Sequence, residues 1–505
     1  MARKRIYNHT RFDGGMTHNK RDTSDLTKLG LISHLDIYRN RNEMFVMPGF
    51  VSDMAYDGSS TGLKVYDPQA FGTLGTDRIF VLTKKSDGTG SKIFERLLSG
   101  TEWDASTTYP SFNTEGTNDL IDYPFFWFAG ADFHYPVKNA GATTVARHGA
   151  NAADYTASWQ SWLTFSIPTG RTYQHRGFNG TWYLTKGGAA SGISSITSSA
   201  VTENAKTTSI TPQHISSGNY QIGIVGTNTL PRRSQILLWD AASSLIDQNI
   251  LLGKGSTMVV GYPSGIWASV GVSASTDLES NGKDEMSVRI IQGETPDTFY
   301  NLQTVSVIDQ TTDIFALNDT YQDSMLWYAR PEIVSGERIQ GIWALGRGEV
   351  NSQFGVSVLL DTSSLGLVRN AHMFGYSMYF IHNSDGSVSR LDDYQTGTYD
   401  VPATIETLIY GADTPYLKEL NGLSITTENL PSGGSIVCYY RTDEDSSWTT
   451  MGTSSTADTK KHSFTKAAGT PIGRFQEIQF KLVITGKISV KNIMIAITET
   501  DELPF

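Results

Sequence analysis

The sequence predicts an all-β protein made of short strands and tight turns. Its hydrophobic share is 39% and its charged share 18%. Both are below the usual values for globular proteins, and Gly, Ser, Thr and aromatic residues fill the difference. Short aromatic and β-branched runs recur along the chain, separated by Asp-Gly, Asn-Gly and similar turn dipeptides. No window longer than about ten residues combines a 3.6-residue apolar period with helix caps, so we expect no long helix.

Residues 44–412 have the spacing of a degenerate β-propeller. A hairpin is predicted over 77–94, around Asp87-Gly88, and the same device returns over 376–391. Strand–turn–strand units recur roughly every 40–50 residues with an aromatic strand in each, which is typical of propeller blades. We expect six to seven blades. A large irregular β-sandwich or jelly-roll assembly is the alternative, because no WD, kelch or Asp-box repeat is present.

Residues 413–505 predict an antiparallel β-sandwich. The turn-forming stretch 411–415 precedes a series of about six short strands. In one of them Ile478, Phe480, Leu482 and Ile484 alternate with other residues, as the buried face of a half-buried strand does. We therefore expect a compact C-terminal domain.

Residues 1–43 predict an extended basic N-terminal arm. Residues 1–41 hold nine Lys and Arg against four Asp, about +5, whereas the rest of the chain carries about −16. Because apolar residues are few, the arm cannot bury a core of its own. We expect it to lie on its own acidic body or on a neighbouring subunit, through these candidate assembly cations: Arg3, Lys4, Arg5, Arg11, Lys20 and Arg21.

The charge balance and the single cysteine exclude several classes. A net charge of −11 argues against general nucleic-acid binding. No stretch approaches the roughly 18 apolar residues of a membrane span, so we expect no membrane insertion. The basic N-terminus has no apolar region after it, so we expect no signal peptide and synthesis in a cytoplasm. Cys438 stands alone, which excludes an intrachain disulfide.

No catalytic motif is present. The stretch from Gly261 to Gly265 misses the Gly-x-Ser-x-Gly elbow by one position, and there is no P-loop or His-Glu-x-x-His. We therefore predict no catalytic residue, no cofactor and no enzyme activity.

One loop has alternating oxygen ligands ahead of a turn glycine, as a Ca²⁺ loop does. Val288 occupies the position of the closing bidentate Glu, so an acidic hairpin tip is the alternative and no metal is predicted. The candidate ligands are Asp277, Glu279, Asn281 and Asp284.

Five aromatic residues lie in loop-like sequence, where they could form a sugar-binding platform or pack between blades. They are Trp103, Tyr109, Trp159, Trp162 and Tyr173.

Three stretches resemble structural proteins of tailed-bacteriophage virions, of the tail-associated β-propeller type. They are the arm motif 11–17 followed by Asp22, the unit 342–386 with its aromatic strands, and the stretch 439–480. The resemblance implies a non-enzymatic component of the tail or head–tail region, made in the host cytoplasm and located in the virion. Its implied partners are other virion proteins and copies of itself. No catalytic or ligand residue is carried over.

Three other functions stay open. The chain could be a phage receptor-binding protein that recognises a host glycan or surface protein, since loops with aromatic residues suit that role. A propeller-type polysaccharide-degrading enzyme is the second, because such sites form where blade loops converge. A cellular adhesion protein is the third. The sequence alone does not fix the position in a particle or the copy number.

Overall fold

Strands and tight turns make up the computed structural model of the chain, whose described residues contain no α-helix and two 3₁₀ turns, Pro263–Gly265 and Ser363–Leu365. No helix in this described part is long and apolar enough to cross a membrane. The structure describes 3–54; then 66–74, 78–85, 91–97, 103, 118–120, 127–129, 132–139, 144–149 and 160–164; and 175–504 without 186–190, 198–199, 228–233, 253–255, 277–281, 307, 309–312, 334–337, 350–351, 376, 383–386, 444 and 468.

Antiparallel sheets follow one another along the middle of the chain, as predicted. The first five comprise β8 (Tyr66–Leu74), β9 (Arg78–Lys85) and β10 (Ser91–Leu97); β11 (Asn118–Leu120), β12 (Trp127–Ala129), β13 (Asp132–Asn139), β14 (Thr144–Gly149) and β15 (Gln160–Thr164); β16 (His175–Phe178), β17 (Thr181–Thr185), β18 (Gly192–Ile196) and β19 (Val201–Thr207); β20 (Thr211–Ser217), β21 (Ile222–Thr227), β22 (Ser234–Trp239) and β23 (Gln248–Leu251); and β24 (Ser256–Gly261), β25 (Trp267–Ser273), β26 (Asp284–Gln292) and β27 (Thr295–Thr304). Two more comprise β28 (Ile314–Tyr321), β29 (Ser324–Ala329), β30 (Gly341–Gly346) and β31 (Gly355–Asp361); and β32 (Val368–Phe374), β33 (Ser377–His382) and β34 (Ser387–Leu391) with β7 (Phe50–Met54).

Turn chemistry sets the strand register. Asn179 and Gly180 both have positive φ, 49° and 78°, and join β16 to β17 in the tight hairpin that such residues favour. The two hairpins predicted over 77–94 and 376–391 are confirmed as β9–β10 and β33–β34.

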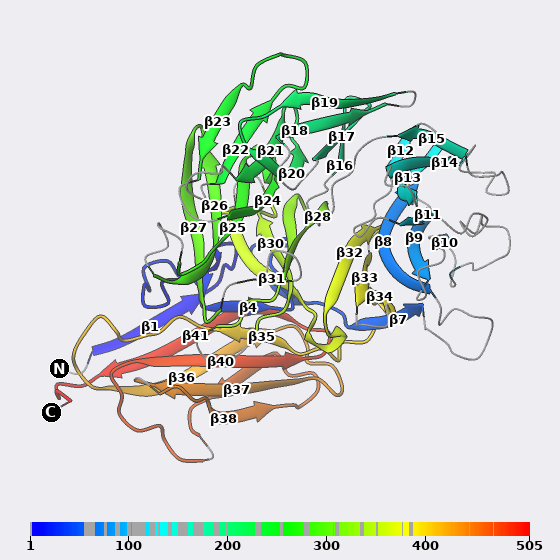
Figure 1. The fold of residues 1–505 in the computed structure, drawn as a ribbon. Coiled ribbons are helices and arrows are strands. Elements are labelled where there is room, and N and C mark those ends of the chain that lie inside the picture. Colours follow the sequence, from blue (N-terminus) through cyan, green and yellow to red (C-terminus); the bar gives the residue numbers. More distant parts are fainter. Residues whose placement is uncertain are drawn as a thin grey trace.

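These sheets form a β-propeller arrangement. The first strands of successive sheets pack side by side, from β16 through β20, β24, β28 and β32 to β8 (Figure 1). Apolar residues on facing sheets bury one another; for example, Trp267 packs with Val225 and Ile236 between β24–β27 and β20–β23. Such stacking buries both faces of sheets that are apolar on both sides.

The C-terminal strands belong to two sheets that share a core. One contains β36 (Lys418–Thr427), β39 (Lys461–Phe464) and β41 (Ser489–Glu499), and the other contains β35 (Ala403–Glu406), β37 (Ser435–Thr442), β38 (Thr449–Ser454) and β40 (Ile478–Thr485). The predicted period-2 face of β40 is confirmed, since Ile478, Phe480, Leu482 and Ile484 are all buried in this core.

The N-terminal segment contributes strands to these sheets. β1 (Arg3–His9) and the pair β5 (Leu35–Asp36) and β6 (Met44–Val46) extend the sheet of β41, while β4 (Leu31–Ser33) joins the other sheet; a short parallel pair, β2 (Gly15–Met16) and β3 (Lys28–Leu29), lies between. The sequence predicted an extended arm over 1–43 that lies on its own acidic body or on a neighbouring subunit, and the described part of this segment lies on the body of its own chain, as strands of these sheets. The reason is that its scattered apolar residues, such as Phe12, Leu29 and Tyr38, are buried in a core that other parts of the chain complete.

One continuous sheet crosses from the propeller into the C-terminal part. Its order is β28-β29-β30-β31-β4-β35-β40-β37-β38. β4 bridges the two parts, because Ser33 pairs with Val358 of β31 on one side and with Thr404 of β35 on the other. Figure 1 shows the two parts joined at this strand.

Candidate functional site

The N-terminal junction, defined as residues 3–54, holds four polar side chains that bond to distant strands or loops: His9, His34, Asp36 and Asp53. It begins as β1 beside β41, passes through β4 between the two parts, and ends as β7 on the outer edge of the last propeller sheet, next to β34. The junction therefore touches both the C-terminal sheets and the propeller.

Most of the predicted assembly cations pair within the chain. Arg5 contacts Asp413 and places its Nη2 3.0 Å from Glu499. Arg11 pairs with Asp13 at 2.6 Å.

Two more cations reach the C-terminal strands. Lys20 Nζ lies 2.9 Å from Glu406, and Arg21 Nη2 lies 3.0 Å from Glu477. By contrast, Arg3 and Lys4 are exposed at the start of β1.

A buried histidine holds β1 in place. His9 Nδ1 donates to the Leu26 carbonyl at 2.7 Å, and its Nε2 accepts from the Tyr410 hydroxyl at 2.6 Å. Burial lowers the pKa of His9 to about 4, so the ring is neutral at pH 7. The Tyr7 ring packs against Tyr410 at 4.7 Å between centroids.

A second buried histidine lies at the bridge. His34 has φ 62°, a conformation uncommon outside glycine. Its backbone N–H donates to Val358, and its Nδ1 accepts the Asp361 N–H at 3.2 Å. Burial lowers its pKa to about 4. The neutral ring thus fixes the chain at the point where β4 meets the propeller.

A buried carboxylate links the junction to β28. Asp36 accepts from the Tyr321 hydroxyl at 2.6 Å and from the Tyr38 N–H at 2.8 Å, and Arg39 Nε lies 3.4 Å away. The Arg39 guanidinium also lies 4.7 Å from the centre of the Tyr394 ring. Burial raises the pKa of Asp36, and burial together with Asp36 raises that of Tyr321.

Asp53 on β7 joins the last propeller sheet to the first. It accepts from Arg96 on β10, from Trp103 Nε1 at 2.7 Å and from Arg390 Nε on β34 at 3.0 Å. The Asp53 side chain is 4% exposed. Tyr379 packs edge-on against Trp103, with its ring centre 6.3 Å away. The Asp53 carboxylate therefore accepts hydrogen bonds from both the first and the last propeller sheet, and we call this contact the Asp53 seam.

The predicted Ca²⁺ loop is described at only one of its four candidate ligands. Of the Ca²⁺ candidates, Asp284 accepts the Ser275 N–H at 2.6 Å, whereas Asp277, Glu279 and Asn281 lie outside the described residues. The described part of the chain holds no group of three His, Cys, Asp or Glu placed to bind a metal.

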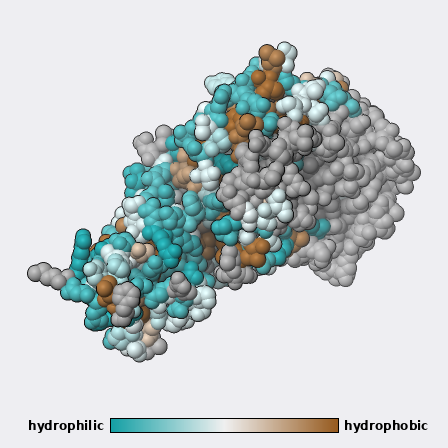
Figure 2. All heavy atoms as spheres, turned by 60° about the vertical axis from the view of Figure 1, so that its left-hand side comes forward, coloured by the Kyte–Doolittle hydropathy of each residue, from teal (hydrophilic) through white to brown (hydrophobic). Residues whose placement is uncertain are grey.

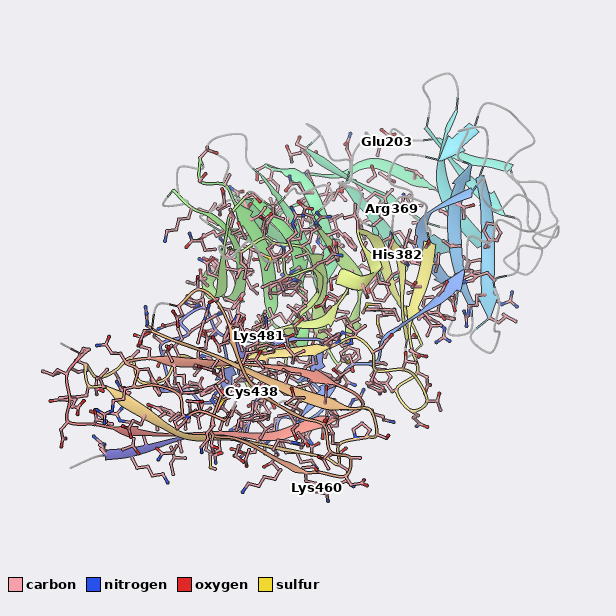
Figure 3. All side chains as sticks on the ribbon, turned by 90° about the horizontal axis from the view of Figure 1, so that it is seen from below. Glu203, Arg369, His382, Cys438, Lys460 and Lys481 are labelled. Atoms are coloured by element: carbon pink, nitrogen blue, oxygen red, sulfur yellow. The ribbon has the colours of Figure 1, made fainter. Side chains whose placement is uncertain are left out.

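The cysteine and the aromatic candidates have structural surroundings. Cys438 is buried among the C-terminal strands, where burial raises the pKa of its thiol (Figure 3). Trp103 packs at the Asp53 seam. Of the other four aromatic candidates, Tyr109, Trp159 and Tyr173 lie outside the described residues, as does the side chain of Trp162.

The polar groups of the junction therefore hold the strands of the two parts together. Its two buried histidines are neutral, and its buried carboxylates are held by tyrosine, tryptophan and arginine donors. Sequence reasoning missed Asp36 and Asp53, because each reads as an ordinary acid beside polar residues. The weak signal was the alternation of Arg5, Tyr7 and His9, which marks a strand rather than a free arm.

Comparisons with known proteins identify no family for the chain. No family model and no curated protein matches the chain. Similar solved chains include one from an S. cerevisiae complex of dbp5 with nup159 and gle1 (10% identity, 75% of this chain and 99% of that one, TM-score 0.39). The β-propeller domain of the Pyrococcus furiosus Trilobed protease is 9% identical over 68% of this chain and 90% of that one, with a TM-score of 0.29. The Dos1 propeller is 9% identical over 71% of this chain and 82% of that one, with a TM-score of 0.35. Such low values give no basis for transferring a function.

Proposed function

We propose that the chain is a seven-bladed propeller closed by β7, with its N- and C-terminal strands forming a β-sandwich beside it. The count rests on seven successive antiparallel sheets from β8 to β34. Closure rests on β7, which lies N-terminal to all the others yet pairs with β34 of the last sheet. Pairing the first and last strands of the propeller in one blade closes such a ring and leaves no open edge between its first and last sheets.

On this architecture we propose a non-enzymatic structural component of a tailed-phage virion, located in the tail or head–tail region. The carrying observation is the N-terminal junction, which ties the propeller to the sandwich through buried polar groups. A particle component made without disulfides must stay folded outside the cell. A closed β fold whose first and last sheets are joined by buried hydrogen bonds meets that requirement. Its partners are other virion proteins and copies of itself.

Immunoelectron microscopy of purified particles tests this proposal. Antibodies against the chain, applied to particles encoded by the genome that carries its gene, are expected to label one fixed position on the tail. The chain is also expected in the protein content of the washed particles. Its absence from them would contradict the proposal.

A receptor-binding role is the second candidate, favoured by the very exposed Tyr220 and Leu245 on the loops of β20–β23. Cells blocked by the purified chain against infection by the same phage would favour this role. A screen for cleavage of host polysaccharides addresses the third candidate, an enzyme, and we expect no cleavage.

A further inference from the structure

The three most exposed large hydrophobic side chains of the described residues lie in two places. Tyr220 is 85% exposed and Leu245 74% exposed, and both lie on loops of the sheet β20–β23. Ile6, at 56%, lies on β1. Exposed apolar residues are ordinary when scattered singly, whereas exposed apolar patches mark interaction sites. We call Tyr220 and Leu245 the apolar tip.

The apolar tip is built on hydrogen-bonded loops. Gln221, next to Tyr220, donates to Asp247 at 3.1 Å, which joins the two loops. Lys206 Nζ, from the neighbouring sheet, donates to the Ser244 carbonyl at 2.6 Å. Asp240 accepts the Ser243 N–H at 2.7 Å, and Trp239 Nε1 donates to the Ser243 carbonyl at 2.9 Å. Leu245 is thus presented by a pre-organised loop, which lowers the entropy cost of binding.

The tip is acidic at its rim. Asp240 and Asp247 flank Leu245 in the loop, and backbone hydrogen bonds from Ser243 and Ala242 lower the pKa of Asp240. The Lys206 ammonium, from the neighbouring sheet, donates to the backbone carbonyls of Ser243 and Ser244. Figure 2 shows hydrophobic atoms projecting at the top of the molecule, the end where β20–β23 lie in Figure 1.

The basic edge, defined as Arg3, Lys4 and Ile6, has the opposite character. Among the described strands β1 pairs with β41 alone, so its other side is an edge of the sheet. Ile6 is exposed, the exposed Lys4 lies on the same face of β1, and the exposed Arg3 begins the strand, in a chain whose net charge is −11. Such an edge pairs poorly with a second β1, because the cations would face one another. The basic edge is instead complementary to an apolar surface with an acidic rim.

We propose that the apolar tip of one copy docks on the basic edge of the next copy of this chain. Figure 1 places β20–β23 at the upper left and β1 at the lower left, so one copy presents the two surfaces in different places. The contact is then head-to-tail, and it builds a ring where the rotation closes and a filament where it does not. This inference rests on the proposed assembly function and names the contact between copies.

Two single variants and their mixture test the contact by sedimentation velocity. Leu245→Asp removes the tip and Ile6→Asp removes the edge. Each is expected to be monomeric where the unmodified chain forms larger species, while far-UV circular dichroism is unchanged because both side chains are exposed. An equimolar mixture retains one intact tip and one intact edge per pair, so it is expected to form dimers and nothing larger.

Val305→Asp is the matched control, since Val305 is 52% exposed and belongs to neither surface. It is expected to assemble like the unmodified chain. Raising the salt concentration is expected to weaken assembly, because exposed charges are screened. The inference is overturned if the full chain stays monomeric, if either variant still assembles, or if the mixture gives no dimer. Particle labelling is independent of these results, so a tail component with a different self-contact remains distinguishable.

Discussion

Asp53 illustrates how single buried acids organise this molecule. Its carboxylate takes donors from β10, β34 and Trp103, so three separate stretches of chain converge on one side chain. A charge taken out of water is costly unless it is paired and hydrogen-bonded, and removing one partner leaves the others uncompensated. The same logic applies to Asp36 with Tyr321 and Arg39.

Asp53→Asn is expected to lower the free energy of unfolding by about 3–5 kcal/mol, since it leaves Arg96 and Arg390 without their shared acid. Urea unfolding measures the loss. Asp323→Asn is the control: Asp323 is exposed with φ 59°, where asparagine fits, so little change is expected. An equal loss in both variants would contradict the importance of the seam.

Protonation of His9 and His34 makes stability depend on pH. Burial lowers both pKa values from 6.5 to about 4, so the folded state binds these protons less readily than the unfolded chain. Their contribution is complete above pH 6.5 and is lost as pH falls toward 4, by about 3 kcal/mol for each histidine. Urea unfolding at pH 7 and pH 4.5 is expected to show this fall.

His34→Asn supplies the complementary measurement. Asparagine tolerates the φ of 62° at this position, so the fold is expected to survive while the fall between pH 7 and 4.5 becomes smaller. His18→Asn, at an exposed histidine, is the matched control. A fall that stays the same size in His34→Asn would assign the pH dependence to other groups.

At the scale of elements, β1 shows how a basic segment becomes part of a sheet. Tyr7 and His9 point into the core while Ile6 and Asn8 are exposed, so the strand alternates as a half-buried edge strand does. Its full length pairs with β41, from Arg3 opposite Glu499 to His9 opposite Ile493. The pairing, rather than net charge, decides where the segment lies.

Adjacent substitutions in β1 test this register. Tyr7→Ala is expected to cost about 3 kcal/mol, because it removes the ring that packs on Tyr410. Ile6→Ala is expected to cost under about 0.5 kcal/mol, because its side chain is exposed. Thermal unfolding of the two variants makes the comparison, and equal effects would mean that β1 is not seated in this register.

At the scale of the whole molecule, the nine-stranded sheet crosses the boundary that the turn-forming stretch 411–415 predicts near residue 413. Its strands come from the propeller, from β4 and from the C-terminal region. The sheet of β41 likewise needs β1, β5 and β6 from the N-terminal junction. A segment that begins at residue 413 lacks these strands, and it would expose the apolar surface that they cover.

Residues 413–505 expressed alone are therefore expected not to fold, whereas the full chain is expected to unfold without an early separate transition of its C-terminal strands. Heteronuclear NMR of the fragment, and urea unfolding of the full chain followed by tryptophan fluorescence and circular dichroism, measure this. A folded fragment with dispersed resonances would restore the independent C-terminal domain expected from sequence.

Local patterns were readable from the sequence where their causes are local. Turn sequences that end in Asp-Gly predicted the hairpins β9–β10 and β33–β34, and the alternation of Ile478 through Ile484 predicted the buried face of β40. The junction was harder to read, because Phe12 and Tyr38 are too sparse to suggest a core until distant strands surround them.

An all-β chain of aromatic strands and tight turns can be predicted from the sequence, because strand periodicity and turn conformation depend on neighbouring residues. The tertiary structure sets the course of the basic N-terminal segment, which joins two sheets and ends beside β34. It also decided that Asp36, Asp53, His9 and His34 are buried partners rather than surface groups. These outcomes depend on pairings across hundreds of residues, whose free energy comes from the shared core and from desolvated charge, and no local pattern records them.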